Sequence, residues 1–249
     1  MRKFMEWIEW QSCPICGSED VIFEREIGDC RVCTHKFRQY VPKEIKEHYF
    51  DKKYWDNDKN RQGINSVKMS EEWTRWVSAR LKILESFDLL GHDDPSKVHV
   101  LEFGCAEGML LYALKQKGYQ VMGNDVCAIA DESMKELGIE ISKAPIEEFA
   151  SGDYKFDLIM SFHVIEHIRD PFSVMKNLSN MLKPGGVLLM HVPVDDQELS
   201  NMDHFHFFTN ESCMCLMKQF TEDIRSDFVY YPITKGGAAM AATYVGVKK

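Results

Sequence analysis

The stretch of sequence that decides the fold is residues 98–115, which begins Val98-His99-Val100-Leu101-Glu102-Phe103 and continues Gly104-Cys105-Ala106-Glu107-Gly108. The first six residues are a short run typical of a β-strand, and the next five form a glycine-containing turn. Residues 109–115, which follow and are mostly apolar, favour a helix. A strand, a glycine turn and a helix in this order point backbone N–H groups at a ligand. The stretch therefore predicts a nucleotide-type α/β domain whose chemistry begins at this turn.

A second predicted strand, residues 120–125, ends in Asp125, a little over twenty residues after the turn. A carboxylate at this place can accept hydrogen bonds from both hydroxyls of a ribose. Dinucleotide-binding folds use Gly-x-Gly-x-x-Gly, whereas this turn is Gly-x-x-x-Gly, with Ala106 where a middle glycine would stand. Glu102 at the strand end would repel a pyrophosphate but attract an ammonium or a sulfonium group. The pattern therefore favours S-adenosylmethionine over a nicotinamide dinucleotide.

Several motifs between residues 76 and 220 resemble, in the same order, those of the class I S-adenosylmethionine-dependent methyltransferases. The departures are Ala106 in place of a common glycine and Glu107 in place of a common small polar residue. The matching segments are residues 102–108, Asp125, 146–149, 156–167 and 182–190, which resemble in turn the glycine-rich first motif, the ribose-binding acid, the adenine contact, the fourth strand with the segment after it, and the turn into the fifth strand.

This resemblance implies an α/β fold with a doubly wound, seven-stranded, mostly parallel sheet of the Rossmann-like type. Helical patterns at residues 130–137 and 172–182 fit it, and strands at 228–231 and 241–247 would add an antiparallel hairpin at one edge. The implied cofactor is S-adenosyl-L-methionine. The residues implied to bind it are Glu102, Gly104, Cys105, Ala106, Gly108, Asp125, Val126, Ile146, Ser161 and Phe162.

Four cysteines near the start form the pattern Cys13-Pro-Ile-Cys16 and Cys30-Arg-Val-Cys33, with thirteen residues between the two pairs. Each Cys-x-x-Cys places two sulfurs on one tight turn, and two such turns can enclose Zn²⁺ in a tetrahedral thiolate cage. Residues 21–27 between them favour a strand, so we expect a zinc ribbon with these four ligands. His35 is an alternative to one cysteine, and a pair of disulfides is the competing interpretation. A closed four-ligand site serves structure or recognition rather than catalysis.

The chain accordingly divides into a zinc-ribbon module (1–40), an aromatic connector or cap (41–75) and a methyltransferase domain (76–249). The connector is polar and rich in aromatic residues, which suits either a cap over a substrate pocket or ordinary packing between domains. A capping pattern at Ser70 predicts that a helix begins there and ends near Gly91.

Two groups of polar residues follow predicted strands, where ligands bind in open α/β sheets. His163, Glu166 and His167 follow the fourth strand, and Asp203-His204-Phe205-His206 follows the fifth. If His163 begins a helical turn, Glu166 and His167 share its face. Methyl transfer to a hydroxyl requires removal of a proton, and a histidine suits that task near neutral pH. We expect His163 to be the base, with His204 and His206 as the next candidates.

A metal-binding interpretation competes with the general base. The pattern His-x-x-Glu-His resembles the Glu-x-x-Glu-His divalent-metal motif of ubiquinone-pathway O-methyltransferases and of small-RNA 2′-O-methyltransferases, with His163 replacing the first acid. A second divalent metal held by His163, Glu166, His167 and His204 would have nitrogen-rich ligands, which suit zinc, iron or manganese better than magnesium. A third interpretation is that Glu166 and His167 only fix the loop by hydrogen bonds. His191, inside a predicted strand, is expected to be structural.

Composition bounds the class of protein. The chain has 249 residues, 45% hydrophobic and 28% charged, as expected of a soluble globular protein. The net charge of −9 disfavours nucleic acid as a partner, and no apolar run is long enough to cross a membrane. Residues 1–11 are charged and carry two tryptophans, so no signal peptide is expected. Paired and scattered cysteines in a chain of this length favour the reducing cytoplasm.

The leading hypothesis is a cytoplasmic enzyme that methylates a hydroxyl of a small molecule, such as a sugar, capsule or natural-product intermediate. The alternatives are an RNA methyltransferase, of the ribosomal guanine-N1 or 2′-O type, and a non-catalytic cofactor-binding scaffold. Lysine and arginine are interspersed with acids, as in residues 43–47, which disfavours RNA binding. The acceptor, the methylated atom and the oligomeric state stay open.

Overall fold

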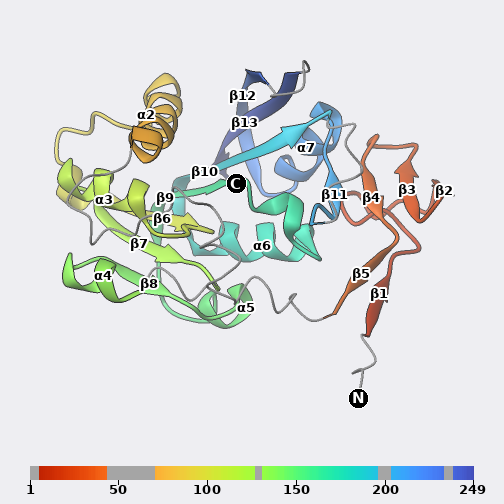
Figure 1. Cartoon of the computed structure of the whole chain (residues 1–249), viewed down its shortest axis with the longest axis horizontal. Helices are drawn as coiled ribbons and strands as arrows, with labels where there is room; N and C mark the ends of the chain where they lie inside the picture. Colours follow the sequence, from red (N-terminus) through yellow and green to blue (C-terminus); the bar gives the residue numbers. More distant parts are fainter. Residues whose placement is uncertain (1–5, 44–70, 127–130, 196–202, 233–237) are drawn as a thin grey trace. The chain divides into compact units, whose positions relative to one another are not determined.

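The computed structural model describes residues 6–43, 71–126, 131–195, 203–232 and 238–249. Two compact units are present. The first comprises Met1–Ile45, Ser161–Asn180 and Val187–Lys249, and the second comprises Lys46–Met160 and Met181–Gly186. A mixed, mostly parallel sheet of seven strands confirms the predicted architecture (Figure 1). In spatial order its strands are β12 (Thr221–Pro232), β13 (Ala238–Lys248), β10 (Leu182–Val194), β9 (Phe156–Phe162), β6 (His99–Phe103), β7 (Gln120–Asn124) and β8 (Glu140–Ser142).

The second unit contains the predicted strand, turn and helix. Strands β6, β7 and β8 are parallel, and Phe103 pairs with Asn124 at their carboxyl ends. Helix α3 (Met109–Gln116) follows the turn and buries four apolar side chains, as its nearly continuous apolar sequence predicts. The other helices among the described residues of this unit are α2 (Glu71–Ser86), the 3₁₀ turn η2 (Pro95–Lys97), α4 (Asp131–Glu136) and α5 (Ile146–Phe149).

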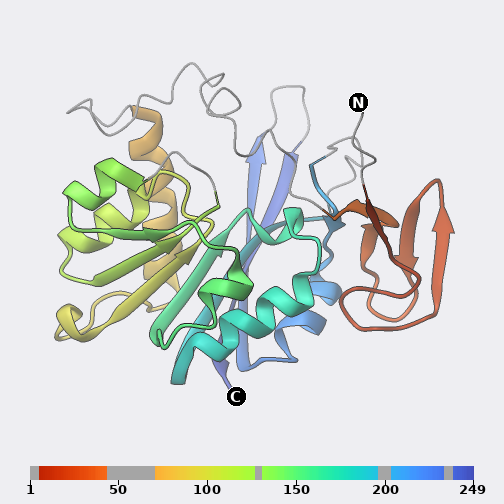
Figure 2. The same cartoon turned by 90° about the horizontal axis from the view of Figure 1, so that it is seen from below.

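The first unit contains the predicted antiparallel hairpin, and its strands are longer than the sequence pattern predicts. β13 pairs antiparallel with both β10 and β12, and the two long blue strands β12 and β13 run side by side in Figure 2. The charged start of β12 does not resemble a strand, but pairing with the buried β13 determines its conformation, and an edge strand tolerates charge. Helix α6 (Pro171–Met181), the 3₁₀ turn η4 (Ile165–His167) and α7 (Asn210–Met217) complete this part.

The N-terminal module forms two small antiparallel sheets. One joins β1 (Trp7–Glu9) to β5 (Tyr40–Pro42), and the other has the order β11-β4-β3-β2. Residues 21–27 do not form the single predicted strand, because Arg25 and Glu26 both take left-handed φ values and turn the chain into a hairpin. The strands of the second sheet are β2 (Val21–Glu24), β3 (Ile27–Cys30), β4 (Lys36–Arg38) and β11 (His206–Phe207).

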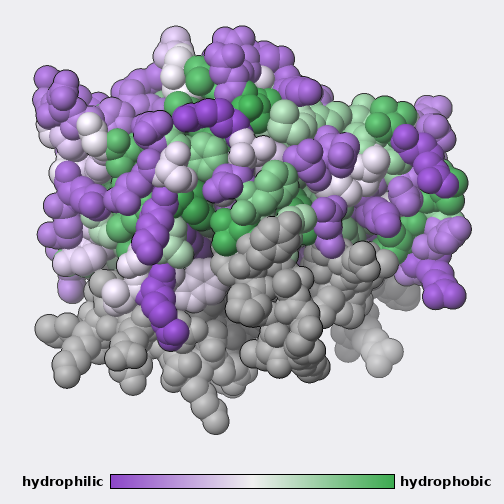
Figure 3. All heavy atoms as spheres, turned by 90° about the horizontal axis from the view of Figure 1, so that it is seen from above, coloured by the Kyte–Doolittle hydropathy of each residue, from purple (hydrophilic) through white to green (hydrophobic). Residues whose placement is uncertain are grey.

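The predicted domain limits at residues 40 and 75 stay predictions. β5 extends to Pro42, and most of the predicted connector lies outside the described residues, as do Cys127 and residue 130 of the predicted helix 130–137. Helix α2 begins at Glu71 and ends at Ser86, a few residues before the predicted end. On the face shown in Figure 3, hydrophilic residues are interspersed with smaller groups of hydrophobic ones. Within the described part of the chain, no helix has the length and apolar character needed to cross a membrane.

Candidate functional site

The glycine turn after β6 is held in left-handed backbone conformations. Gly104, Ala106 and Gly108 have φ values of 75°, 47° and 72°. An added Cβ at Gly108 would lie 3.2 Å from Met134 and from Ile141, so glycine suits this place for space as well as for conformation. Ala106 takes a backbone conformation that favours glycine, which agrees with the glycine that is common at this position in the family whose first motif residues 102–108 resemble.

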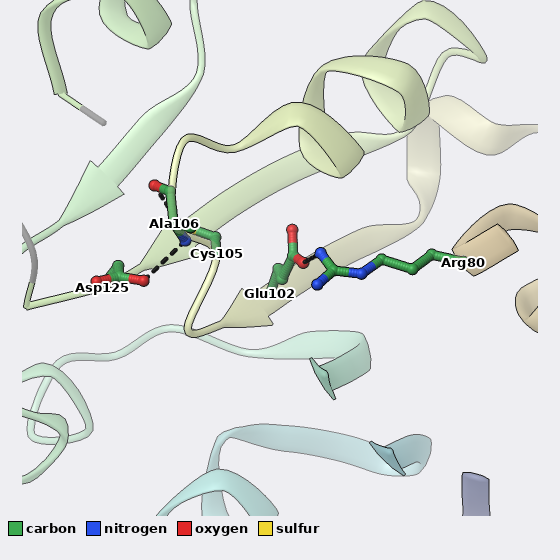
Figure 4. A network of polar contacts seen from close by, with 5 residues as sticks. All are labelled: Arg80, Glu102, Cys105, Ala106 and Asp125. Atoms are coloured by element: carbon green, nitrogen blue, oxygen red, sulfur yellow. Dashed lines mark hydrogen bonds and ion pairs between the residues drawn. The ribbon is translucent and has the colours of Figure 1, made fainter. Parts of the chain in front are cut away.

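Asp125 closes the turn from the end of β7. Its Oδ2 accepts a hydrogen bond of 2.7 Å from the backbone N–H of Ala106 (Figure 4). The Gly104 N–H donates to the carbonyl of Asn124 at 2.7 Å. The acid predicted to bind ribose is therefore fixed against the turn predicted to bind the cofactor. This contact brings the two predicted motifs into one arrangement.

Glu102 is a buried carboxylate at the end of β6. Its Oε1 lies 3.2 Å from Nη1 of Arg80 on α2, while its Oε2 has no hydrogen-bond partner among the described residues (Figure 4). The pKa of Glu102 is raised to about 7, mainly because the group is buried; the charge of Arg80 opposes this rise and that of Asp125 adds to it. The residue therefore offers a buried oxygen to a cation that a ligand brings.

Sequence reasoning missed Arg80. A signal was present, since Arg80 stands three residues after Val77 and four before Leu84, on the buried face of an amphipathic helix. A cation on such a face requires an anion nearby.

The other residues predicted to bind the cofactor lie in several elements. Cys105 is buried in the turn, which raises the pKa of its thiol, and Val126 is half-buried just after Asp125. Ile146 is buried at the start of α5. Ser161 and Phe162 are buried at the end of β9, in the first unit.

His163 follows β9 in a strained conformation. Its φ is 55°, and its N–H donates to the carbonyl of His191 at 2.9 Å. The expected helical turn does not begin at His163, because the 3₁₀ turn η4 begins two residues later, at Ile165. Even so, Nδ1 of His163 lies 3.4 Å from Oε1 of Glu166. The left-handed backbone thus brings together two side chains that a helix was expected to bring together.

Glu166, His167 and His204 form one cluster, in which one ligand atom from each lies within 4.8 Å of the others. The rings of His167 and His204 meet edge to face at 4.7 Å, and Nδ1 of His167 donates to the carbonyl of Asp203 at 2.9 Å. Burial alone would raise the pKa of Glu166, but His163 and His167 lower it below its ordinary value. Both of its carboxylate oxygens are buried, and Oε1 lies 3.4 Å from Nδ1 of His163 and 3.9 Å from Nε2 of His167.

The other two histidines considered make different contacts. Nδ1 of His206 lies 3.0 Å from Nε2 of His35, and burial lowers the pKa of His206 to about 4. His191 is buried in β10 with its Nδ1 2.8 Å from Oγ1 of Thr243, as expected of a structural residue.

The four N-terminal cysteines converge, and their Sγ atoms all lie within 4.8 Å of one another. Cys13 is 3.6 Å from Cys33, and Cys16 is 3.5 Å from Cys30. A zinc ion with bonds of about 2.3 Å to four sulfurs in a tetrahedron would hold them about 3.8 Å apart, so the set fits zinc.

The two cysteine turns have the same construction. Gly17 donates to the carbonyl of Cys13, and Thr34 to that of Cys30, both from left-handed conformations. His35 contacts His206 rather than joining the four cysteines.

Comparison with known proteins gives a consistent result. A family model described as a methyltransferase domain matches residues 67–221, more than half of the chain. A ubiquinone biosynthesis O-methyltransferase of Pseudomonas fluorescens (strain SBW25) is 26% identical over 141 residues, covering 54% of this chain and 55% of that protein. Another, of Ruegeria pomeroyi, is 30% identical over 105 residues, covering 39% and 42%. The chain thus spans about half the length of the curated relatives it matches.

Solved structures show the same fold at low identity. A magnesium protoporphyrin IX methyltransferase from Synechocystis PCC 6803, determined with bound SAH, has a TM-score of 0.58 at 13% identity and matches 81% of this chain and 97% of its own. A SAM-dependent methyltransferase from Archaeoglobus fulgidus has a TM-score of 0.55 at 15% identity and matches 80% of this chain and 100% of its own. The fold of the chain is therefore Rossmann-like.

Proposed function

Because the chain belongs to the class I S-adenosylmethionine-dependent methyltransferases, we propose that it methylates a hydroxyl of a small molecule, with sugar, capsule or natural-product intermediates as the acceptor class. The observation that carries the hydroxyl assignment is the buried Glu166 carboxylate beside His163 and His167, because a histidine next to an ionised carboxylate can take the proton of a hydroxyl. The O-methyltransferase names of the curated relatives agree with it.

The residues of the second unit fit the cofactor. The unpartnered Oε2 of Glu102 would receive the ammonium of the methionyl group, and the carboxylate of Asp125 would receive the ribose hydroxyls. The glycine turn permits close approach of the backbone to the adenosyl group. When bound, the cofactor supplies a methyl group on a sulfonium, which is ready for attack by an oxygen nucleophile.

His163 is the proposed base. Its Nδ1 faces the ionised Glu166, which stabilises the imidazolium that forms when His163 accepts a proton. As the acceptor oxygen is methylated, His163 would accept its proton. His204 serves beside His167 in orienting the acceptor.

A metal-assisted variant of the same reaction has its own support. Nδ1 of His167 donates to the Asp203 carbonyl, so in the neutral ring Nε2 carries a lone pair, and it lies 3.9 Å from Oε1 of Glu166. With His204 these groups offer one carboxylate and two nitrogens, a set suited to manganese, iron or zinc. A divalent ion held there would lower the pKa of an acceptor hydroxyl.

A direct experiment tests the proposal. The protein would be incubated with methyl-labelled S-adenosylmethionine and a panel of nucleotide sugars, glycans, phenols and ribosomal RNA. Label on a hydroxyl of a small molecule is expected, whereas label on RNA alone would contradict the proposal. Elemental analysis separates the two mechanisms. A content of one zinc per chain supports the mechanism with a histidine base. A second metal ion per chain that is absent from the His167→Gln variant supports the metal-assisted mechanism.

Cofactor binding is expected to depend on pH through Glu102. Its pKa is raised to about 7, so the carboxyl is mostly neutral at pH 6 and mostly ionised at pH 8. Because only the ionised form pairs with an ammonium, the affinity for S-adenosylhomocysteine should rise about tenfold between these values. Calorimetry at pH 6, 7 and 8 would measure it. Glu102→Gln should bind S-adenosylhomocysteine more weakly than the parent at pH 8, and its affinity should not change between pH 6 and pH 8. If the affinity of this variant rises with pH as much as that of the parent, Glu102 is not the group responsible.

A further inference from the structure

The sheet of the N-terminal module is completed by a strand from near the other end of the chain. β11 pairs antiparallel with β4, with His206 opposite Phe37 and Phe207 opposite Lys36. The red module strands and the blue β11 lie next to each other in both ribbon views (Figures 1 and 2). Thr34, in the second cysteine turn, adds a hydrogen bond of 2.6 Å to Thr209 just beyond β11. The module and the segment that carries His204 therefore share one sheet.

A buried histidine pair joins the cysteine turn to this strand. The carbonyl of His35 accepts a hydrogen bond of 2.9 Å from the N–H of Cys30, so the turn that carries Cys30 and Cys33 also fixes His35. The ring of His35 stacks on that of His206 at 5.2 Å, with Phe208 against both. Both histidines are almost completely buried.

Arg38 holds the preceding loop with its backbone and its side chain. Its N–H donates to the carbonyl of Phe205 at 2.9 Å, and its Nε donates to the carbonyl of His204 at 2.9 Å. The guanidinium also lies over the ring of Phe207, 5.6 Å from the ring centre. A lysine has no Nε–H in this planar geometry, so it could not make the same set of contacts.

The other side of this loop contacts the candidate catalytic cluster. The N–H of Phe205 donates to the carbonyl of Glu166 at 2.9 Å, and the carbonyl of Asp203 accepts from His167. Residues 203–205 therefore lie between Arg38 on one side and Glu166 with His167 on the other. The imidazole of His204, in this loop, meets that of His167 edge to face, with 4.7 Å between the ring centroids.

We propose that Arg38 is a positioning residue, which fixes the backbone of His204 so that its imidazole faces Glu166 and His167. The zinc-binding module then acts on methyl transfer by holding part of the acceptor site, a role beyond recognition of a partner. This inference rests on the proposed function, in which His204 orients the acceptor, and it deepens it by assigning a residue of the module to the same site.

The experiment compares Arg38→Met and Arg38→Lys with the parent and with Arg31→Met. Arg31 is an exposed arginine in the second cysteine turn. Arg31→Met therefore removes one positive charge, as Arg38→Met does, but leaves the contacts of Arg38 with residues 204 and 205 in place. The first measurement is the nuclear Overhauser effect between the ring protons of His167 and His204, with S-adenosylhomocysteine as the only added ligand. Zinc content and the affinity for S-adenosylhomocysteine report folding of the module and of the cofactor site. Turnover is measured with any acceptor that the panel identifies.

Both Arg38 variants should lose the His167–His204 signal while they retain zinc and bind S-adenosylhomocysteine within about twofold of the parent. Their kcat should fall about 10- to 100-fold with little change in KM for S-adenosylmethionine. Retention of the signal in Arg38→Met, or an equal loss in Arg31→Met, would overturn the inference. The signal is read without an acceptor, so a failure to find any methylated acceptor would count against the proposed function alone.

Discussion

Replacement of Cys33 by serine is expected to remove zinc and to unfold the N-terminal module. Cys33 is buried, and its sulfur is 3.6 Å from that of Cys13 on the other cysteine turn, so its loss opens the four-sulfur cage. Structural zinc contributes about 10–16 kcal/mol in zinc-finger peptides, which is more than so small a module gains from its apolar residues. The expected result is no zinc per chain and an earlier unfolding transition, measured by elemental analysis and by calorimetry.

Cys215→Ser is the matched control for this prediction. Cys215 interacts with Cys33 from helix α7, but it is outside the group of four cysteines that fits a metal. It should therefore keep one zinc per chain and unfold close to the parent temperature. If Cys33→Ser keeps its zinc, or if the parent binds none, the zinc ribbon is not the correct interpretation of these cysteines.

Glu166→Gln is expected to have the largest effect on turnover. The carboxylate orients His163 in one mechanism and binds a metal in the other, and the amide does neither well. General acid–base groups contribute about 10²–10⁴-fold, so kcat should fall by that amount, while S-adenosylhomocysteine still binds. Because the pKa of Glu166 is lowered, the carboxylate of the parent stays ionised throughout the neutral range, so its own titration should not change the ratio of parent to variant kcat there.

Single-turnover kinetics with the labelled cofactor would measure this loss, with Glu211→Gln as the control. Glu211 is an exposed carboxylate at the start of helix α7 in the same unit, and its replacement should leave kcat within about twofold. A parent-like kcat for Glu166→Gln would show that the cluster serves the loop only. Two further variants separate the mechanisms. If His163 acts as a base, His163→Gln should have a lower kcat than His167→Gln. If a metal acts, His163→Gln should have the higher kcat of the two.

The sequence predicts those features that depend on residues close together in the chain. The strand, turn and helix around Gly104 follow from local apolar runs and glycine spacing, and the four cysteines are recognisable because zinc ligands repeat at short intervals. The contact between Asp125 and the turn was also within reach, because parallel neighbouring strands end at the same edge.

The partners of buried polar groups were not predictable in this way. Arg80 pairs with Glu102 and Arg38 holds His204 across long sequence separations, and such contacts depend on how elements pack. His206 resembles a catalytic residue by its place after a strand, yet its neighbour is His35, 171 positions away. His163 likewise has a left-handed φ, and its N–H donates to the carbonyl of His191 in β10.

The pairing of β4 with β11 has a consequence for protein engineering. A shortened variant that starts after residue 45, or a chimera with a foreign N-terminal segment, would lack β4 and would leave the edge of β11 unpaired. Exposed edge strands can pair with strands of other chains, so such proteins should aggregate or dimerise rather than stay monomeric. Any transplant of this catalytic region needs to carry its first 45 residues along.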